Sequence, residues 1–375
     1  MLHWLTIGAK LIDLSTTLPQ THPIMASFVN QRLRQARLQR RLSQQEVADS
    51  LKITKQMVSK YEASTIPASD KLIELARLYK TRMDYFFSQP KVALGEINFR
   101  KKSSFSAKKL NALKESVRMQ IENYLYVENL LELKTTFKNP LEKSPIQSTE
   151  DVVKAVDQLR KAWNIGNDPI HNIIAMLEDK EIKVIEIDDD TMRFDGLATI
   201  IDEKYYVIVV NKQMPIERMR FTLLHELGHL LLNLNAKDEQ EVEKLCHAFA
   251  SEMLISSKNL IAEMGKNRSS ITLEELKNTQ EKYGISIQAI VVKLRDLDVI
   301  NSQQYSTFFK KLNANAQFKA AIDESRFNGA EFSNRFKNLV HHALAEEAIT
   351  LSKASTLLEI PLSELKDSML TLKIK

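Results

Sequence analysis

The chain has 375 residues, of which 43% are hydrophobic and 27% are charged, a composition that excludes wholesale disorder. Its longest apolar run spans only residues 205–210, whereas a membrane helix needs about 20 such residues, so we expect no membrane partner. Glycine and proline are scarce, at 8 and 9 residues, which favours long helices and a mainly α protein. The single cysteine, Cys246, cannot form an internal disulfide, and this fits a reducing cytoplasm.

The net charge of +5 is distributed unevenly along the chain. Residues 26–110 carry 18 basic and 7 acidic side chains, whereas the rest of the chain carries 35 and 41. A basic N-terminal part joined to an acidic remainder suggests that one module binds an anion such as nucleic acid. The alternative is that these charges only form a solvated surface.

The N-terminal part divides into a tail, a helical domain and a linker. Residues 1–25 are expected to be a disordered tail, or an artefact of the chosen start site. They lack the basic start of a secretory signal peptide, so secretion is not expected. Residues 26–90 read as five short helices, with a capping box at Ser43 and Glu46 before the second helix. Residues 91–149 follow as a basic linker and one long amphipathic helix.

The second and third of the five helices have the form of a helix–turn–helix, in which the later helix lies in the major groove of DNA. Polar and basic residues near the N-termini of these two helices are the candidate DNA contacts: Gln44, Thr54, Lys55, Gln56, Ser59 and Lys60. Glutamine suits adenine edges, and lysine suits guanine or phosphate. A plain helical bundle with a polar surface is the alternative, which the basic charge balance disfavours.

This stretch resembles the XRE family of helix–turn–helix repressors. The residues at the family's positions are Ser43-Gln44, Ala48, Ile53, Val58-Ser59 and Glu62. Lys52 stands where the family usually has glycine in the turn. The resemblance implies a lambda-repressor-like domain that binds a palindromic double-stranded DNA operator as a homodimer.

Residues 150–262 are expected to form an α+β domain with a small sheet. The expected strands are residues 183–187 and a hairpin of residues 196–202 and 205–211, and strongly helical segments follow at residues 217–232 and 240–255. Residues 263–375 are helical again, with helix–turn–helix rhythms at residues 273–294 and 349–370. The sequence therefore predicts a mainly α protein with a small β-sheet.

The first of these helical segments contains His225-Glu226-x-x-His229. Histidines at i and i+4 share one helix face and can chelate one zinc ion, which leaves the intervening glutamate beside the metal-bound water. Apolar flanks predict a buried helix, where two unpaired histidines would be costly, so Zn²⁺ binding is favoured over satisfied core histidines. A catalytic zinc needs a third protein ligand. Spacing alone leaves six candidates, which are Asp238, Glu239, Glu241, Glu243, His247 and Glu252.

Residues 196–256 resemble the ImmA/IrrE family of metallo-endopeptidases. The family signature is a strand pair, an RFTLxHELGH-type helix and an E-x-x-C/A-N-x-x-A helix, which residues 220–229 and 243–250 match. The resemblance implies a zincin-like domain with Glu243 as the third ligand and Glu226 as the catalytic base. His247 occupies the usual asparagine position, which leaves open whether it competes as a ligand or orients substrate. Ser256 stands where proline is common.

Several other residues have both a functional and a structural interpretation. Tyr205, Tyr206 and His247 are candidates for stabilising a transition state, although a structural role is favoured for each. The strand at residues 205–210 either offers an edge to an extended peptide or lies in the core. Cys246 is expected to be a small core residue.

The order of helix–turn–helix, basic linker, long helix, HELGH domain and helical tail resembles the fused XRE–ImmA/IrrE regulators of bacteria and mobile elements. In separate-chain relatives, a protease cleaves an XRE repressor and so derepresses its operon. The resemblance implies a zinc-dependent endopeptidase that cleaves itself or a partner repressor and controls a stress, mobile-element or toxin operon. The alternative is an antitoxin-like repressor, paired with a toxin, whose metal domain is structural or senses a signal. The presence of Glu226 favours the peptidase, since a structural site does not require that carboxylate.

Overall fold

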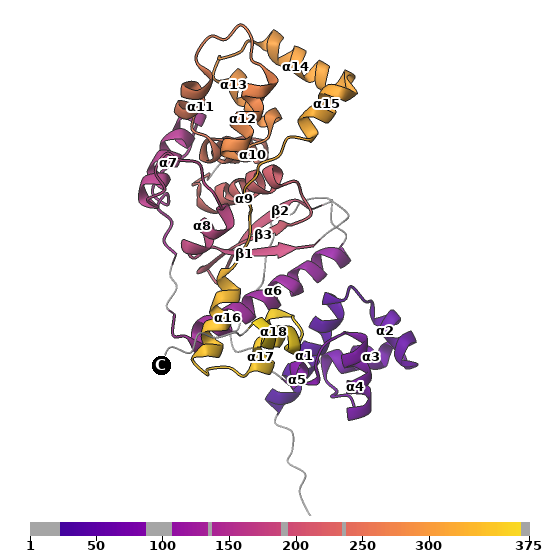
Figure 1. Ribbon diagram of the computed structural model, residues 1–375. Coiled ribbons are helices and arrows are strands. Elements are labelled where there is room, and N and C mark those ends of the chain that lie inside the picture. Colours follow the sequence, from indigo (N-terminus) through magenta and orange to yellow (C-terminus); the bar gives the residue numbers. More distant parts are fainter. Residues whose placement is uncertain (1–22, 88–106, 134–136, 189–193, 235–237, 369–375) are drawn as a thin grey trace, which may run out of the picture. The chain divides into compact units, whose positions relative to one another are not determined.

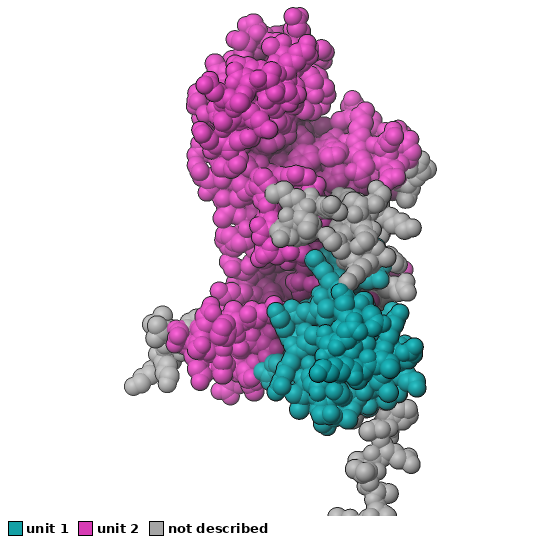
Figure 2. All heavy atoms as spheres, turned by 90° about the vertical axis from the view of Figure 1, so that its right-hand side faces the viewer, with its two compact units in different colours: residues 1–90, 107–115 teal, residues 91–106, 116–375 magenta. Residues whose placement is uncertain are grey.

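The structure, a computed structural model, divides the chain into two compact units, which Figure 2 colours separately. Unit 1 comprises residues 1–90 and 107–115, and unit 2 comprises residues 91–106 and 116–375. The structure describes residues 23–87, 107–133, 137–188, 194–234 and 238–368. Of the expected tail at residues 1–25, only residues 23–25 lie in this described part, where they open helix α1 (Pro23–Gln39), and the basic run of the expected linker, at residues 99–106, lies outside it. No helix within the described ranges is long and apolar enough to cross a bilayer.

Unit 1 is the five-helix bundle that the sequence predicted. Its helices are α1, α2 (Gln44–Leu51), α3 (Lys55–Ala63), α4 (Ser69–Leu78) and α5 (Met83–Phe87) (Figure 1). Helix α2 begins at the expected capping box, in which the Ser43 hydroxyl accepts the backbone N–H of Glu46 and the Glu46 carboxylate accepts that of Ser43. All five helices contribute apolar side chains to the core, among them Leu33, Val47, Val58, Leu75 and Phe86.

The turn between α2 and α3 keeps a left-handed residue although it lacks glycine. Lys52 has φ 53° and ψ 45°, a region that glycine adopts more easily than other residues. Its backbone N–H donates to the carbonyl groups of Ala48 and Asp49, which closes the end of α2. The unusual lysine therefore leaves the left-handed geometry of the turn in place.

Unit 2 contains a three-stranded sheet made of β1 (Lys183–Ile187), β2 (Gly196–Ile201) and β3 (Tyr205–Asn211). The strand order is β1-β3-β2, with β1 parallel and β2 antiparallel to β3. Because β3 is the central strand, the suggestion that residues 205–210 offer a peptide-binding edge is wrong. The alternative is confirmed, since β3 is a core strand with Val207–Val210 fully buried. In the described part of the sheet, β1 and β2 are the two outer strands.

Helices cover this sheet and extend beyond it. They are α7 (Thr149–Ala162), α8 (Ile173–Asp179), α9 (Ile216–Leu231), α10 (Glu239–Leu254), α11 (Ser257–Met264), α12 (Leu273–Tyr283), α13 (Ile287–Asp296), α14 (Ser302–Ala314) and α15 (Ala316–Asp323). Helix α9 lies across the sheet and packs against α10 on its other side (Figure 1). One continuous apolar core joins the sheet to α7–α13 and fixes the position of α9.

The C-terminal part of unit 2 is a separate small cluster of helices. Helices α16 (Arg335–Ala345), α17 (Leu351–Leu358) and α18 (Leu362–Ser368) pack against residues 126–131 at the end of helix α6 (Ala107–Leu130). The expected rhythm at residues 349–370 is seen as α17 and α18 joined by the left-handed Glu359. Residues 325–334, between α15 and α16, form a strap without helix or strand that runs along α9 and α8.

Candidate metal centre and nucleic-acid interface

Helix α9 carries both histidines of the HExxH pattern into a buried environment. Leu223, Leu224 and Leu227 are fully buried, so the helix is anchored by its apolar face. Gly228 allows α10 to approach closely, because a Cβ at this position would lie 3.3 Å from the ring of Phe249. The sequence at these positions therefore brings α10, with its acidic residues, next to the histidines.

Donor atoms of three residues converge between α9 and α10. The Nε2 atoms of His225 and His229 lie 3.1 Å apart, and the two carboxylate oxygens of Glu243 lie 3.2 Å from one Nε2 each. Ligand atoms that surround a zinc ion tetrahedrally, at about 2.0–2.1 Å, lie about 3.3 Å from one another. Two imidazoles and one carboxylate at these separations fit a zinc-type metal ion. The structure thus brings His225, His229 and Glu243 together.

Two of the other candidate ligands have different roles. The Asp238 side chain caps α10 by accepting the backbone N–H of Glu241 at 2.7 Å. Glu252 accepts from the Lys293 ammonium at 2.6 Å in a buried ion pair and from the hydroxyl of Ser257. These interactions occupy both side chains, whereas Glu239 and Glu241 are exposed in the first turn of α10.

Cys246 and His247 both lie beside the three donor residues. Cys246 is fully buried, as expected, and its Sγ lies 3.5 Å from Nδ1 of His229. If His229 binds a metal ion, this contact at its second ring nitrogen would orient the imidazole, which the apolar pattern around Cys246 did not indicate. His247 is exposed, its ring lies 4.5 Å from that of His225 between centroids, and it stacks on Phe221.

Glu226 lies on the side of α9 that faces strand β2. It is buried, and its Cγ would lie 3.2 Å from a Cβ at Gly196. The same Cβ would lie 2.5 Å from the Thr222 methyl, a separation that real Cβ atoms do not show. Glycine at the first position of β2 therefore allows the strand to lie against the helix at Glu226.

The two tyrosines proposed as transition-state stabilisers contact other groups. Tyr206 packs edge-to-face on Phe137, with ring centroids 4.5 Å apart, and burial raises its pKa. The Lys204 ammonium lies 5.0 Å from the ring centroid of Tyr205. Both contacts fit the alternative interpretation, in which the two tyrosines have structural roles.

A cleft of about 1890 Å³ opens beside the donor residues. Glu243 and His247 of α10 line the cleft, as do residues of α13, α14 and α15. Phe221, Tyr305 and Phe309 give the cleft a partly aromatic surface. Sequence reasoning missed the contribution of α14 and α15, because these helices carry no motif.

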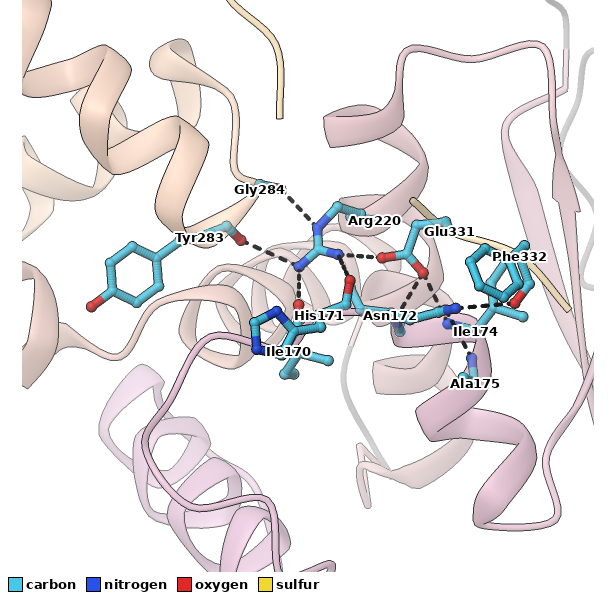
Figure 3. Close-up of polar contacts among 11 residues, drawn as sticks. Ile170, His171, Asn172, Ile174, Ala175, Arg220, Tyr283, Gly284, Glu331 and Phe332 are labelled. Carbon is cyan, nitrogen blue, oxygen red and sulfur yellow. Dashed lines mark hydrogen bonds and ion pairs between the residues drawn. The ribbon is translucent and has the colours of Figure 1, made fainter. Parts of the chain in front are cut away.

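The N-terminal half of α9 is tied to the rest of unit 2 through Arg220, whose side chain is fully buried (Figure 3). Its guanidinium donates to four backbone carbonyl groups, those of Ile170, His171, Tyr283 and Gly284. It also forms an ion pair with Glu331 of the strap. The second carboxylate oxygen of Glu331 accepts the N–H groups of Ile173 and Ile174, at 2.7 and 3.0 Å, at the start of α8.

In unit 1, most of the predicted DNA contacts lie on one exposed surface of α3. Lys55, Gln56, Ser59 and Lys60 are exposed. Thr54 is exposed at the N-cap, where its hydroxyl accepts the backbone N–H of Met57.

Gln44 is more constrained than the residues of α3. Its amide donates to Glu62 at 2.9 Å, and the same carboxylate pairs with Arg37 at 2.5 and 2.8 Å. This interaction fixes the start of α2 relative to α1 and α3. Gln44 therefore has a positioning role that composition did not reveal.

Comparison with protein-family models finds the same two regions. A helix-turn-helix model matches residues 33–86, and a model of the IrrE N-terminal-like domain matches residues 177–295. The second match runs from α8 to α13 and includes the whole sheet, α9 and α10. A search of curated proteins finds no match. The chain thus joins an XRE-type helix-turn-helix domain to an IrrE N-terminal-like domain of the metallopeptidase type.

Proposed function

We propose that the chain is a DNA-binding transcriptional regulator whose second domain is a zinc-dependent endopeptidase. The observation that carries this proposal is the close approach of His225, His229 and Glu243, with separations of 3.1–3.2 Å, beside a large cleft. A zinc ion bound there would act as a Lewis acid, which polarises a peptide carbonyl and lowers the pKa of water.

Glu226 is the residue that would move the proton. It follows His225 directly in α9 but is not one of the three converging donors. In this proposal its carboxylate accepts a proton from the attacking water and passes it to the leaving amine. Glu226 is buried and lies beside Gly196 at the start of β2.

The substrate we propose is an extended segment of a protein, docked on β2. The carbonyl of Asp195 accepts the N–H of Asn211 in the β2–β3 ladder, at 3.0 Å. Because antiparallel ladders alternate, the backbone N–H and C=O groups of Ala198 then point away from β3, toward the outer edge of β2. A peptide that adds a strand at this edge would pass the carboxylate of Glu226.

We propose a partner repressor, or the chain itself, as the cleaved protein. Operator binding by a homodimer through α3, and control of a stress, mobile-element or toxin operon, belong to the same proposal. An antitoxin-like repressor with a toxin partner and a structural or sensing metal domain is the second candidate. The position of His247, which brings a further imidazole beside His225 and Glu243, is the observation that favours it.

Substitution of Glu226 by glutamine separates these candidates. Glu226→Gln should retain the metal and the fold, because Glu226 is not among the donors, but should lower cleavage by about 10²–10⁴-fold, since an amide cannot accept the proton. Immunoblots would follow the regulator and its operon's repressor in cells exposed to DNA damage or starvation. Glu274→Gln, which alters an exposed carboxylate on α12, is the matched control. A fragment in wild type and control but not in Glu226→Gln supports the peptidase, and identical banding and derepression in all three supports the second candidate.

A further inference from the structure

Helices α9 and α10 each present a pair of metal-binding side chains at a spacing of four residues. His225 and His229 lie one turn apart on α9, and Glu243 and His247 lie one turn apart on α10. Side chains at i and i+4 share a helix face. Since Gly228 lets the two helices pack closely, the two pairs face each other.

His247 lies as close to His225 as the second histidine of the HExxH pattern does. The ring centroids of His225 and His247 are 4.5 Å apart, and those of His225 and His229 are 4.7 Å apart. One donor atom of each of His225, Glu243 and His247 lies within 4.8 Å of the other two. Phe221 stacks on the His247 ring, with centroids 5.5 Å apart, and so helps to hold the ring at this position.

We propose that His247 is a fourth metal ligand, which closes the site in the resting protein and leaves it when a peptide enters the cleft. Four protein donors of the nitrogen and oxygen type form a closed zinc site, whereas a catalytic site keeps its fourth position open. The inference rests on the proposed metallopeptidase function and adds a means of regulating the same site.

The surroundings of His247 suit a ligand that can be released. It is the one exposed residue among the four donor residues, and it lines the cleft together with Glu243. A peptide in the cleft would contact the imidazole directly and could draw it away from the metal. The step is a ligand exchange, in which the nitrogen donor leaves and a substrate or water oxygen takes its position.

The coordination of the metal tests this inference without an activity assay. X-ray absorption of the zinc-loaded full chain should count three imidazole ligands in wild type and two in His247→Asn, and the cobalt(II) absorption spectrum should change in parallel. His342→Asn, which alters an exposed histidine on α16, is the matched control and should behave like wild type. Circular dichroism would establish that the variants are folded. The number of imidazole ligands in the wild-type protein can be measured even if a variant does not fold.

Acetohydroxamate, a small zinc-binding probe, tests whether the fourth position is closed. If His247 occupies it in about nine-tenths of the molecules, the probe should bind His247→Asn about tenfold more tightly than wild type, because the competent fraction rises by that factor. Two imidazoles in wild type, together with equal probe affinity in all three proteins, would overturn the role of His247 and leave the metal site intact. A wild-type protein that takes up no zinc or cobalt would overturn both this inference and the proposed function.

Discussion

The ion pair between Arg220 and Glu331 should contribute strongly to the stability of unit 2. Both side chains are almost completely buried, at 0% and 1% exposure, so solvent hardly screens their interaction. Glu331→Gln would leave the Arg220 guanidinium buried without a countercharge. The substitution would also replace one of the two carboxylate oxygens of Glu331 by an amide NH₂ group. That group is a donor, and it would face the N–H groups of Arg220 or those at the start of α8.

The expected loss can be estimated from this geometry. Removing one partner of a buried pair typically costs about 3–5 kcal/mol. We expect the lower end, about 3 kcal/mol, because the amide oxygen of glutamine still accepts one of the hydrogen bonds. With an m-value of about 3 kcal/mol/M, the urea midpoint should fall by about 1 M.

Tryptophan fluorescence can follow the unfolding of unit 2 alone. The chain has two tryptophans, so a Trp4→Phe background leaves only Trp163, which lies in the core of unit 2. Glu324→Gln makes the same chemical change at an exposed residue near the strap and serves as the control. If Glu331→Gln and Glu324→Gln shifted the midpoint equally, the argument that the strap stabilises α9 through Arg220 would be refuted.

Two further predictions concern the metal and the DNA. His225→Ala should lose the one zinc ion per chain that we expect in wild type, and stoichiometric zinc retained in elemental analysis would contradict the ligand assignment. Lys55→Ala and Gln56→Ala should change operator preference, whereas Lys80→Ala, on the exposed surface outside α3, should at most weaken binding to all sequences equally and lower the salt dependence. Gel-shift assays with operator and unrelated duplexes at several salt concentrations would show the difference, and unchanged preference in the α3 variants would remove the proposed reading surface.

The sequence indicated the parts of the site that depend on spacing within one helix. The pair His225 and His229 could be read from a four-residue interval, because helical periodicity places both on one face. Glu243 required the family resemblance, since six candidates on or near α10 had equally suitable chemistry. The capping box at Ser43 was also a local pattern, and the structure confirms it.

Contacts between residues far apart in the chain left no comparable pattern in the sequence. Glu331 lies in a segment without helical or strand periodicity, and its partner Arg220 is 111 positions away in the sequence. The order of strands in the sheet was likewise not determined by their patterns. The continuous apolar run of β3 did carry information, however, because strands buried on both faces lack polar alternation. This apolar run therefore favours the central position that β3 occupies.

The contact between β2 and α9 provides a last test, because it depends on one glycine. Gly196→Ala would place a methyl group 2.5 Å from the Thr222 methyl, and relief of such a clash typically costs about 1–3 kcal/mol. Thr222→Ser removes the clashing methyl group but keeps the hydroxyl. The cost of Gly196→Ala should therefore be smaller in a Thr222→Ser background, although not zero, since the Glu226 Cγ at 3.2 Å remains. Urea midpoints of the four proteins, measured by Trp163 fluorescence, give the coupling between the two positions. Strictly additive effects would mean that β2 does not lie against α9 at Thr222, and the packing of β2 on α9 that places the strand beside Glu226 would be refuted.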